Sequence, residues 1–81
     1  MSTVRVLLFA SYADALGTAS LDLEARPGLR VRDVLEAVRE RAGADRLPPS
    51  PLVAVNESYA RLDDPVVPRD EVAIIPPVAG G

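Results

Sequence analysis

The chain has no cysteine, no histidine and no tryptophan, and the first two absences each exclude a class of chemistry. Without cysteine there is no disulfide framework, no thiol nucleophile and no iron–sulfur or zinc–thiolate site. Without histidine, the commonest general base and the commonest transition-metal ligand are missing. All nine basic residues are arginine, so no lysine is present to form a Schiff base. The side chains therefore offer little catalytic chemistry.

Length and charge limit the function further. At 81 residues the chain predicts one small domain, and its hydrophobic content of 48% is too high for a disordered chain. A net charge of −3 makes it a poor binder of phosphate backbones, so we expect no nucleic-acid partner. No secretion signal and no apolar run near the ~20 residues of a membrane helix is visible. The expectation is a cytoplasmic protein that does not enter the membrane.

Hydrophobic periodicity predicts strands separated by one good helix. Residues 4–10 are mostly apolar on both faces, which is typical of a central strand covered on both sides. Residues 11–17 break the pattern and predict one helical turn or a loop. The remaining predicted elements are strands at 19–25, 52–56 and 71–75, a short strand at 59–61 and a helix at 31–42.

The helix has one apolar stripe, formed by Val31, Val34, Leu35, Val38 and Ala42. Its opposite face carries mixed charges and predicts a solvated surface. Arg30 is a poor N-cap, which Asp33 partly offsets through the helix dipole, and Gly43 suits a C-terminal cap.

This order of elements predicts an α+β fold in which a small mixed sheet packs on one main helix. The apolar first and last strands are the best candidates for adjacent, parallel central positions. That arrangement is the β-grasp, or ubiquitin-like, fold. We expect a β-grasp domain at residues 1–76 and an extended tail at residues 77–81. The fold alone leaves function open, because it hosts modifiers, carriers, adaptors and ferredoxins.

The C-terminal segment forms a tapering arm, Pro76-Pro77-Val78-Ala79-Gly80-Gly81. The prolines favour an extended conformation, and the five residues from Pro77 reach about 16 Å. The glycines let the backbone approach a catalytic centre that a Cβ would obstruct. The Gly81 carboxylate is ionised at neutral pH, and it can form an acyl-adenylate that sulfur or an amine then attacks. The alternative is an inert terminal glycine pair.

Several segments resemble one family, the MoaD-like sulfur carriers that form the small subunit of molybdopterin synthase. The resemblance rests on residues 70–81, which end in Pro-Pro-Val-x-Gly-Gly, on residues 4–10, on residues 52–56, which end in Ala-Val-Asn, and on the helix start at 31–35. The chain departs from the family at Arg69, where glycine is usual, at Arg30, where threonine is usual, and at Ala13-Asp14, where Arg-Glu is common. Arginine at a turn that needs positive φ would be strained.

The resemblance implies sulfur delivery. A ubiquitin-activating-type enzyme would use ATP and magnesium to adenylate Gly81, and a persulfide donor would convert it to a thiocarboxylate. The arm would then enter the large synthase subunit and donate sulfur to cyclic pyranopterin monophosphate, with two carriers bound to two large subunits. The implied partner-binding residues are Pro76, Pro77, Val78, Ala79 and Gly80. No permanently bound cofactor or metal is implied.

Three alternatives stay open: a sulfur carrier for thiamine or tRNA thiolation, a ubiquitin-like protein modifier, and an interaction module with an inert tail. Among other residues, Phe9 is assigned to the core, with a partner-facing surface for it and Tyr59 as the alternative. Asp63 and Asp64 are expected to form a turn rather than a magnesium site, and Asn56 is expected to shape a turn. Arg5 and Arg69 are assigned to ordinary surface charge, with contact to an acidic partner as the alternative.

Overall fold

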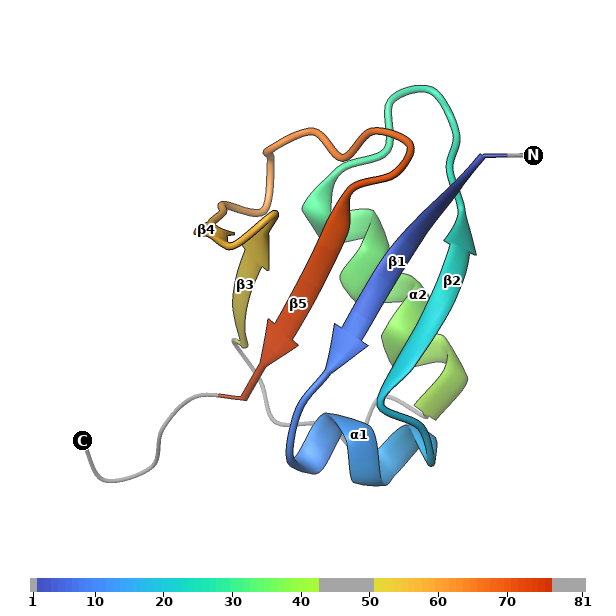
Figure 1. The fold of residues 1–81 in the computed structure, drawn as a ribbon, viewed down its shortest axis with the longest axis vertical. Coiled ribbons are helices and arrows are strands. Elements are labelled where there is room, and N and C mark those ends of the chain that lie inside the picture. The colour runs from blue at the N-terminus through green and yellow to red at the C-terminus, as the bar shows by residue number, and fades with distance from the viewer. Residues whose placement is uncertain (1, 43–50, 77–81) are drawn as a thin grey trace.

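The computed structural model describes residues 2–42 and 51–76. It contains one five-stranded mixed sheet with strand order β2-β1-β5-β3-β4. The strands are β1 (Thr3–Leu8), β2 (Ser20–Glu24), β3 (Leu52–Val55), β4 (Ser58–Tyr59) and β5 (Glu71–Ile75), and the helices are α1 (Ser11–Leu16) and α2 (Val31–Ala42). Figure 1 shows α2 lying across one face of the sheet and α1 closing its lower end. The predicted β-grasp fold is confirmed.

The two central strands are β1 and β5, and they run parallel, with Val6 beside Val72 and Leu8 beside Ile74. All other pairings between strands are antiparallel. The predicted adjacency of the first and last strands is therefore confirmed. It also fixes where β5 ends, because the carboxyl ends of β1 and β5 lie at the same edge of the sheet.

The core lies between the sheet and α2. The helix begins and ends as predicted, and its five predicted stripe residues are the five that are buried. They pack against inward-facing side chains of the strands, including Val4, Val6, Val72 and Ile74, each with no exposed surface. Val31 and Val34 are fully buried as well, so an unpaired polar group at any of these six positions would lose its hydrogen bonds with water. This packing fixes the helix against the inner face of the sheet.

The start of α2 is held by its own third residue. The Asp33 Oδ2 atom accepts a hydrogen bond from the Arg30 backbone N–H at 2.9 Å, which satisfies one of the donors that a helix start leaves free. The sequence predicted only that Asp33 favours the helix dipole, and the structure adds this capping hydrogen bond. Gly43, the predicted C-terminal cap, lies outside the described residues.

The helical turn predicted within residues 11–17 is present as the six-residue helix α1, which Gly17 ends in the left-handed conformation. Two predictions on the strands need correction. The strand expected at 59–61 lies at Ser58–Tyr59. The second concerns β1, for which the sequence predicts cover on both sides. Only the face towards α2 is covered, since Thr3 and Arg5 are exposed and Leu7 is half-buried.

Candidate docking face and C-terminal arm

The face of the sheet opposite α2 has no covering layer in the described part of the chain (Figure 1). We call it the outer face. Strand alternation decides which residues it carries, because successive side chains point to opposite sides. Since Val4, Val6 and Leu8 point inward, Thr3, Arg5 and Leu7 point outward on β1. By the same alternation β5 presents Glu71, Ala73 and Ile75.

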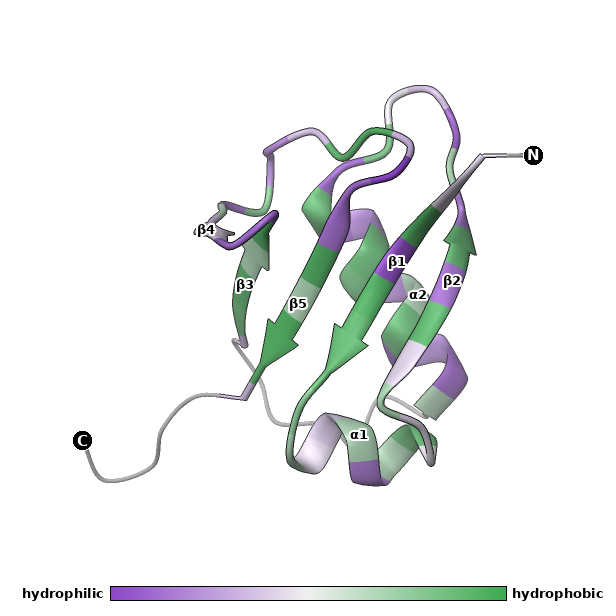
Figure 2. Ribbon diagram, in the orientation of Figure 1, coloured by the Kyte–Doolittle hydropathy of each residue, from purple (hydrophilic) through white to green (hydrophobic). Residues whose placement is uncertain are grey.

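The outer face is divided into a polar half and an apolar half along the strand direction. Figure 2 shows hydrophilic residues towards the start of β1 and β5 and hydrophobic residues towards their carboxyl ends. Register places Leu7 beside Ala73, and Ile75 beside Leu52. These residues, with Phe9 and Ala54, form a continuous apolar area, which we call the apolar half of the outer face.

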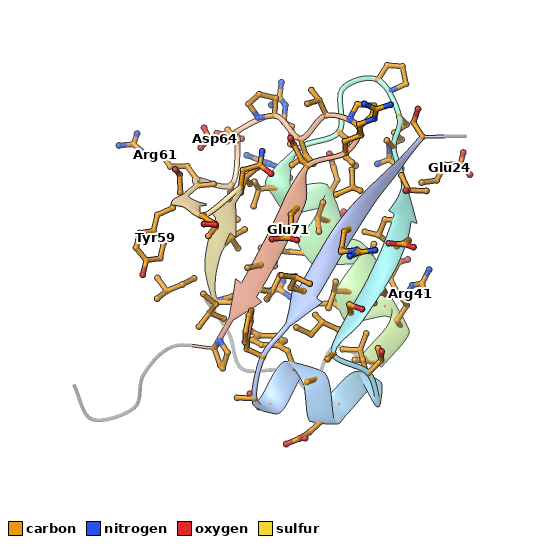
Figure 3. The ribbon with its side chains drawn as sticks, viewed as in Figure 1. Glu24, Arg41, Tyr59, Arg61, Asp64 and Glu71 are labelled. Carbon is orange, nitrogen blue, oxygen red and sulfur yellow. The ribbon has the colours of Figure 1, made fainter. Side chains whose placement is uncertain are left out.

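Phe9 is exposed, with 46% of its surface accessible, so the prediction that it is a core residue is wrong. The reason is alternation: Leu8 points into the core, so the next residue follows Leu7 to the outer side. Tyr59 is 78% exposed and pairs with Ala54 across the β3–β4 hairpin, so it borders the same face (Figure 3). The alternative placement of both aromatic rings on an outer surface is therefore the correct one.

The apolar half adjoins the point where the arm begins. β5 ends at Ile75, which lies beside Leu52, and half-buried Pro76 follows as the last described residue. The other predicted site residues, Pro77, Val78, Ala79, Gly80 and Gly81, lie outside the described residues, so their role stays a prediction. What the structure adds is a surface of exposed apolar side chains, including Leu52 at 44% and Phe9, next to that origin. Such patches typically mark protein-interaction sites.

Within residues 2–42 and 51–76 the buried side chains are apolar except for Tyr12, whose phenol is buried with its ring. No group of three or more acidic side chains in these segments is arranged to hold a metal ion. Asp63 and Asp64 serve structure instead. Asp64 Oδ2 accepts the Arg61 N–H at 2.9 Å within the turn, and Asp63 pairs with Arg30 and Arg32. The prediction of turn formers is confirmed.

The pKa of the Tyr12 side chain departs clearly from its ordinary value. Burial raises the pKa of its phenol, and the positive charge of Arg39 partly opposes that rise. Tyr12 lies in α1 and belongs to the core cluster, on the helix side of the sheet. Its perturbation is therefore a feature of packing and not of the outer face. No helix in the described segments has the length and apolar content to span a membrane.

A β-grasp domain with an uncovered apolar sheet face beside its C-terminal arm has the architecture of a ubiquitin-like carrier or modifier. This chain belongs to the ThiS family, whose model matches residues 6–81. The match includes the whole arm.

Two curated relatives specify the family further. The molybdopterin synthase sulfur carrier subunit of Arabidopsis thaliana is 34% identical over 79 residues, covering 96% of this chain and 82% of the relative. The subunit of the same name from Escherichia coli (strain K12) is 32% identical over 80 residues, covering 96% and 99%. The resemblance to small subunits of molybdopterin synthase, drawn from the sequence, is confirmed.

Solved structures agree on the fold. Small archaeal modifier protein 1 of H. volcanii matches with a TM-score of 0.84 at 24% identity, covering 96% of this chain and 100% of that one. The protein of the same name from Methanosarcina acetivorans matches with a TM-score of 0.79 at 30% identity, covering 100% and 98%. A chain from the complex of subunits 1 and 2 of the molybdopterin-converting factor of Helicobacter pylori matches with a TM-score of 0.68 at 20% identity. The match covers 98% of this chain and 99% of that one.

Proposed function

We propose that this chain is the sulfur carrier subunit of a molybdopterin synthase. The observation that carries the proposal is the apolar half of the outer face, which lies directly beside the origin of the arm. Family membership and the curated relatives support the same role. A carrier needs a surface that seats it on a partner and a reactive end that reaches the partner's active site. We place the carrier in the cytoplasm.

The reactive end in this proposal is the Gly81 carboxylate. An activating enzyme transfers AMP from ATP, with magnesium, to that carboxylate and releases pyrophosphate. A persulfide sulfur displaces the AMP and forms an acyl disulfide. A second thiol then attacks the donor's sulfur, which forms a disulfide on the donor side and releases the thiocarboxylate. In this proposal the chain supplies the carboxylate, and the groups that catalyse these steps belong to the partners. Gly80 and Gly81 give the backbone clearance, and Pro76, Pro77, Val78 and Ala79 lie along the partner's channel.

The large subunit of the synthase is the proposed docking partner, with two carriers on two large subunits. The match to a chain from a complex of subunits 1 and 2 of the molybdopterin-converting factor supports a large-subunit partner. Exposed Phe9 and Leu52 supply apolar contacts, and exposed Tyr59 supplies an aromatic ring with a polar tip at the border. Aromatic side chains of this kind often dominate interface energetics. Docking there would set the start of the arm against the large subunit.

A second candidate is a protein modifier, which would join Gly81 to amino groups of target proteins. The observation that favours it is the 30% identity to small archaeal modifier protein 1 of Methanosarcina acetivorans over the whole chain. Both functions begin with adenylation of the same carboxylate. They differ in the acceptor, which is sulfur for a carrier and a lysine amine for a modifier.

Intact mass measurement tests the proposal. The chain is incubated with the activating enzyme from the same organism, ATP, magnesium and a persulfide donor. A carrier gains the mass difference between one sulfur and one oxygen atom, and a variant lacking Gly81 gains nothing. An unchanged mass with the arm intact contradicts the carrier proposal. Conjugates of higher mass, formed with lysine-bearing proteins and without the sulfur gain, would assign the modifier function instead.

A further inference from the structure

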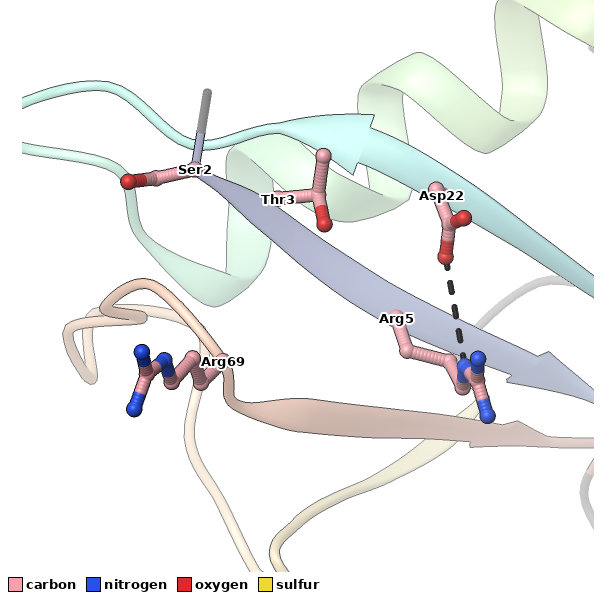
Figure 4. A pocket seen from close by; sticks show the side chains of 5 residues that line it. All are labelled: Ser2, Thr3, Arg5, Asp22 and Arg69. Carbon is pink, nitrogen blue, oxygen red and sulfur yellow. Dashed lines mark ion pairs between the residues drawn. The ribbon is translucent and has the colours of Figure 1, made fainter.

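Two arginines far apart in the sequence line one hollow of about 400 Å³ at the polar half of the outer face. They are Arg5, in β1, and Arg69, just before β5, and the other lining residues are Ser2, Thr3 and Asp22. Figure 4 shows the five side chains around the hollow. Parallel pairing of β1 with β5 brings them together, because the starts of the two strands lie at the same sheet edge.

Arg69 is held there by its backbone. Its N–H donates to the Thr3 carbonyl at 2.9 Å, and the turn around it is closed by the Asp70 N–H donating to the Val67 carbonyl at 3.1 Å. The Asp70 carboxylate also accepts the Val67 N–H at 2.9 Å. The turn therefore presents residue 69 to the hollow in a fixed position.

The conformation of Arg69 disfavours its own residue type. Its φ is 75°, and it follows Pro68, the arrangement of a type II turn that favours glycine or asparagine at this position. A side chain with a Cβ is strained in this region. Arginine therefore makes this turn less stable than glycine would. Such a strained residue points to a function, and the part of Arg69 that can serve one is the guanidinium that lines the hollow.

The charges around the hollow leave one guanidinium unpaired. Arg5 lies 3.9 Å from the Asp22 carboxylate and beside Glu71 in register, so acidic groups flank it on both sides. Arg69 forms no ion pair with any residue in the described segments 2–42 and 51–76. Asp22 and Glu71 would repel a doubly charged anion such as phosphate. A single carboxylate suits the planar donor fork of a guanidinium, with the Ser2 and Thr3 hydroxyls as further donors.

We propose that Arg69, assisted by Arg5, receives a carboxylate side chain of the protein that docks on the outer face. The inference rests on the proposed function, and it states the chemistry of the partner: an apolar surface with an Asp or Glu at one edge. The hollow is continuous with the apolar half, because Arg5 and Leu7 are successive outward residues of β1, about 7 Å apart. One rigid partner surface can thus cover both.

A charge at the edge of an interface acts mainly on the association rate and on register. Apolar contacts alone tolerate small shifts, whereas a carboxylate between two arginines fixes where the partner sits along the strands. The arginine pair would thereby align the arm with the partner's active site.

Binding kinetics of charge variants test the inference, with the large synthase subunit and the activating enzyme as separate probes. Arg69→Asn removes the charge and keeps a residue that tolerates positive φ, and Arg5→Gln removes the second charge. Arg41→Gln is the matched control, because Arg41 is exposed and lies in α2, behind the sheet (Figure 3). Leu52→Ser tests the apolar half independently.

We expect Arg69→Asn and Arg5→Gln each to weaken binding of at least one probe about 3–10-fold, mostly through slower association, and to reduce its salt dependence. Arg69→Asp should weaken it further, and Arg41→Gln should leave it unchanged. If all arginine variants bind both probes like the unmodified chain while Leu52→Ser loses affinity, the arginine inference is wrong and the docking proposal stands. If the unmodified chain binds neither probe, both are wrong.

Discussion

Asn56, which directly follows the carboxyl end of β3, and Glu71, the first residue of the antiparallel neighbour β5, are joined by two hydrogen bonds. The Asn56 backbone N–H donates to the Glu71 carbonyl at 2.8 Å, and the Glu71 N–H donates to Asn56 Oδ1 at 3.0 Å. The Asn56 Nδ2 group also donates to Asp70 Oδ1 at 2.9 Å. One side chain thus ties the β3–β4 turn to the start of β5, which confirms the predicted turn role of Asn56. It holds in place the strand from which the arm extends.

Replacing Asn56 with alanine should therefore lower the free energy of unfolding by about 1–2 kcal/mol. The Glu71 N–H loses its partner, and alanine is less tolerant than asparagine of the positive φ at this position, which is 50°. Urea unfolding measures the change. Ser58→Ala is the matched control in the same hairpin, since Ser58 is exposed, and it should stay within about 0.5 kcal/mol. Equal stability of Asn56→Ala and the unmodified chain would contradict this account of the turn.

Glu57→Gly should stabilise the fold by about 0.5–1 kcal/mol. Asn56 and Glu57 form a two-residue hairpin loop with φ of 50° and 72°, where Asn-Gly is the favoured pair. Glycine removes the steric strain at position 57. It also raises the conformational entropy of the unfolded chain, which cancels part of the gain in stability. The thermal midpoint should rise. Glu40→Gly, at an exposed position of helix α2, should instead lower stability by about 1 kcal/mol, and a fall in the thermal midpoint of both variants would show that the loop carries no strain.

Two exposed leucines, one inside and one outside the proposed docking face, test whether binding depends on that face or on any exposed apolar side chain. Leu52 lies on the apolar half of the outer face, and Leu62 lies in the loop after β4, with 44% and 54% of their surfaces exposed. Leu52→Ser should weaken binding to the large subunit at least about 10-fold, because it removes a central apolar contact. Leu62→Ser should leave affinity unchanged. Calorimetry measures both, and equal losses would contradict the assignment of the outer face.

Tyr12 predicts how stability changes at alkaline pH. Burial raises the pKa of its phenol in the folded chain, so the folded state keeps the proton after the unfolded state has lost it. The resulting stabilisation is complete below the ordinary value of 10.0 and is lost as pH rises above it. Tyr12→Phe should therefore show a shallower fall in stability above pH 10. The stability of Tyr59→Phe, a change at an exposed position, should fall with pH as steeply as that of the unmodified chain. Identical slopes for Tyr12→Phe and the unmodified chain would refute the prediction.

The bounds of helix α2 and strand β5 could be predicted from the sequence, because each residue pattern fits only one kind of element. The stripe from Val31 to Ala42 matches a helical period, and the structure buries those residues. Glu71–Ile75 is a strand as predicted, since β-branched residues precede two prolines. The fold could therefore be assigned from a few local signals and the order of elements.

The docking face could not be predicted in the same way. At the end of β1 the run Leu7-Leu8-Phe9 is apolar at every position, so alternation gives no sign of which side faces solvent. A face covered by a second layer and a face covered by a partner have the same composition. Only the register of β1, β5 and β3 shows that Leu7, Ile75 and Leu52 share an uncovered surface. The strain at Arg69 was predictable from the family resemblance, because the family usually has glycine at this position, and the φ of Arg69 is indeed positive, at 75°.

Single-turnover sulfur transfer tests the central claim most directly. The chain is converted to its thiocarboxylate, mixed with the large subunit and cyclic pyranopterin monophosphate, and followed by intact mass and by the pterin product. The account predicts that the mass returns to that of the carboxylate form as molybdopterin appears, with two carriers consumed for each dithiolene formed. A thiocarboxylate that persists while the large subunit is bound, with no molybdopterin formed, would contradict the assignment of this chain as the sulfur carrier of that enzyme.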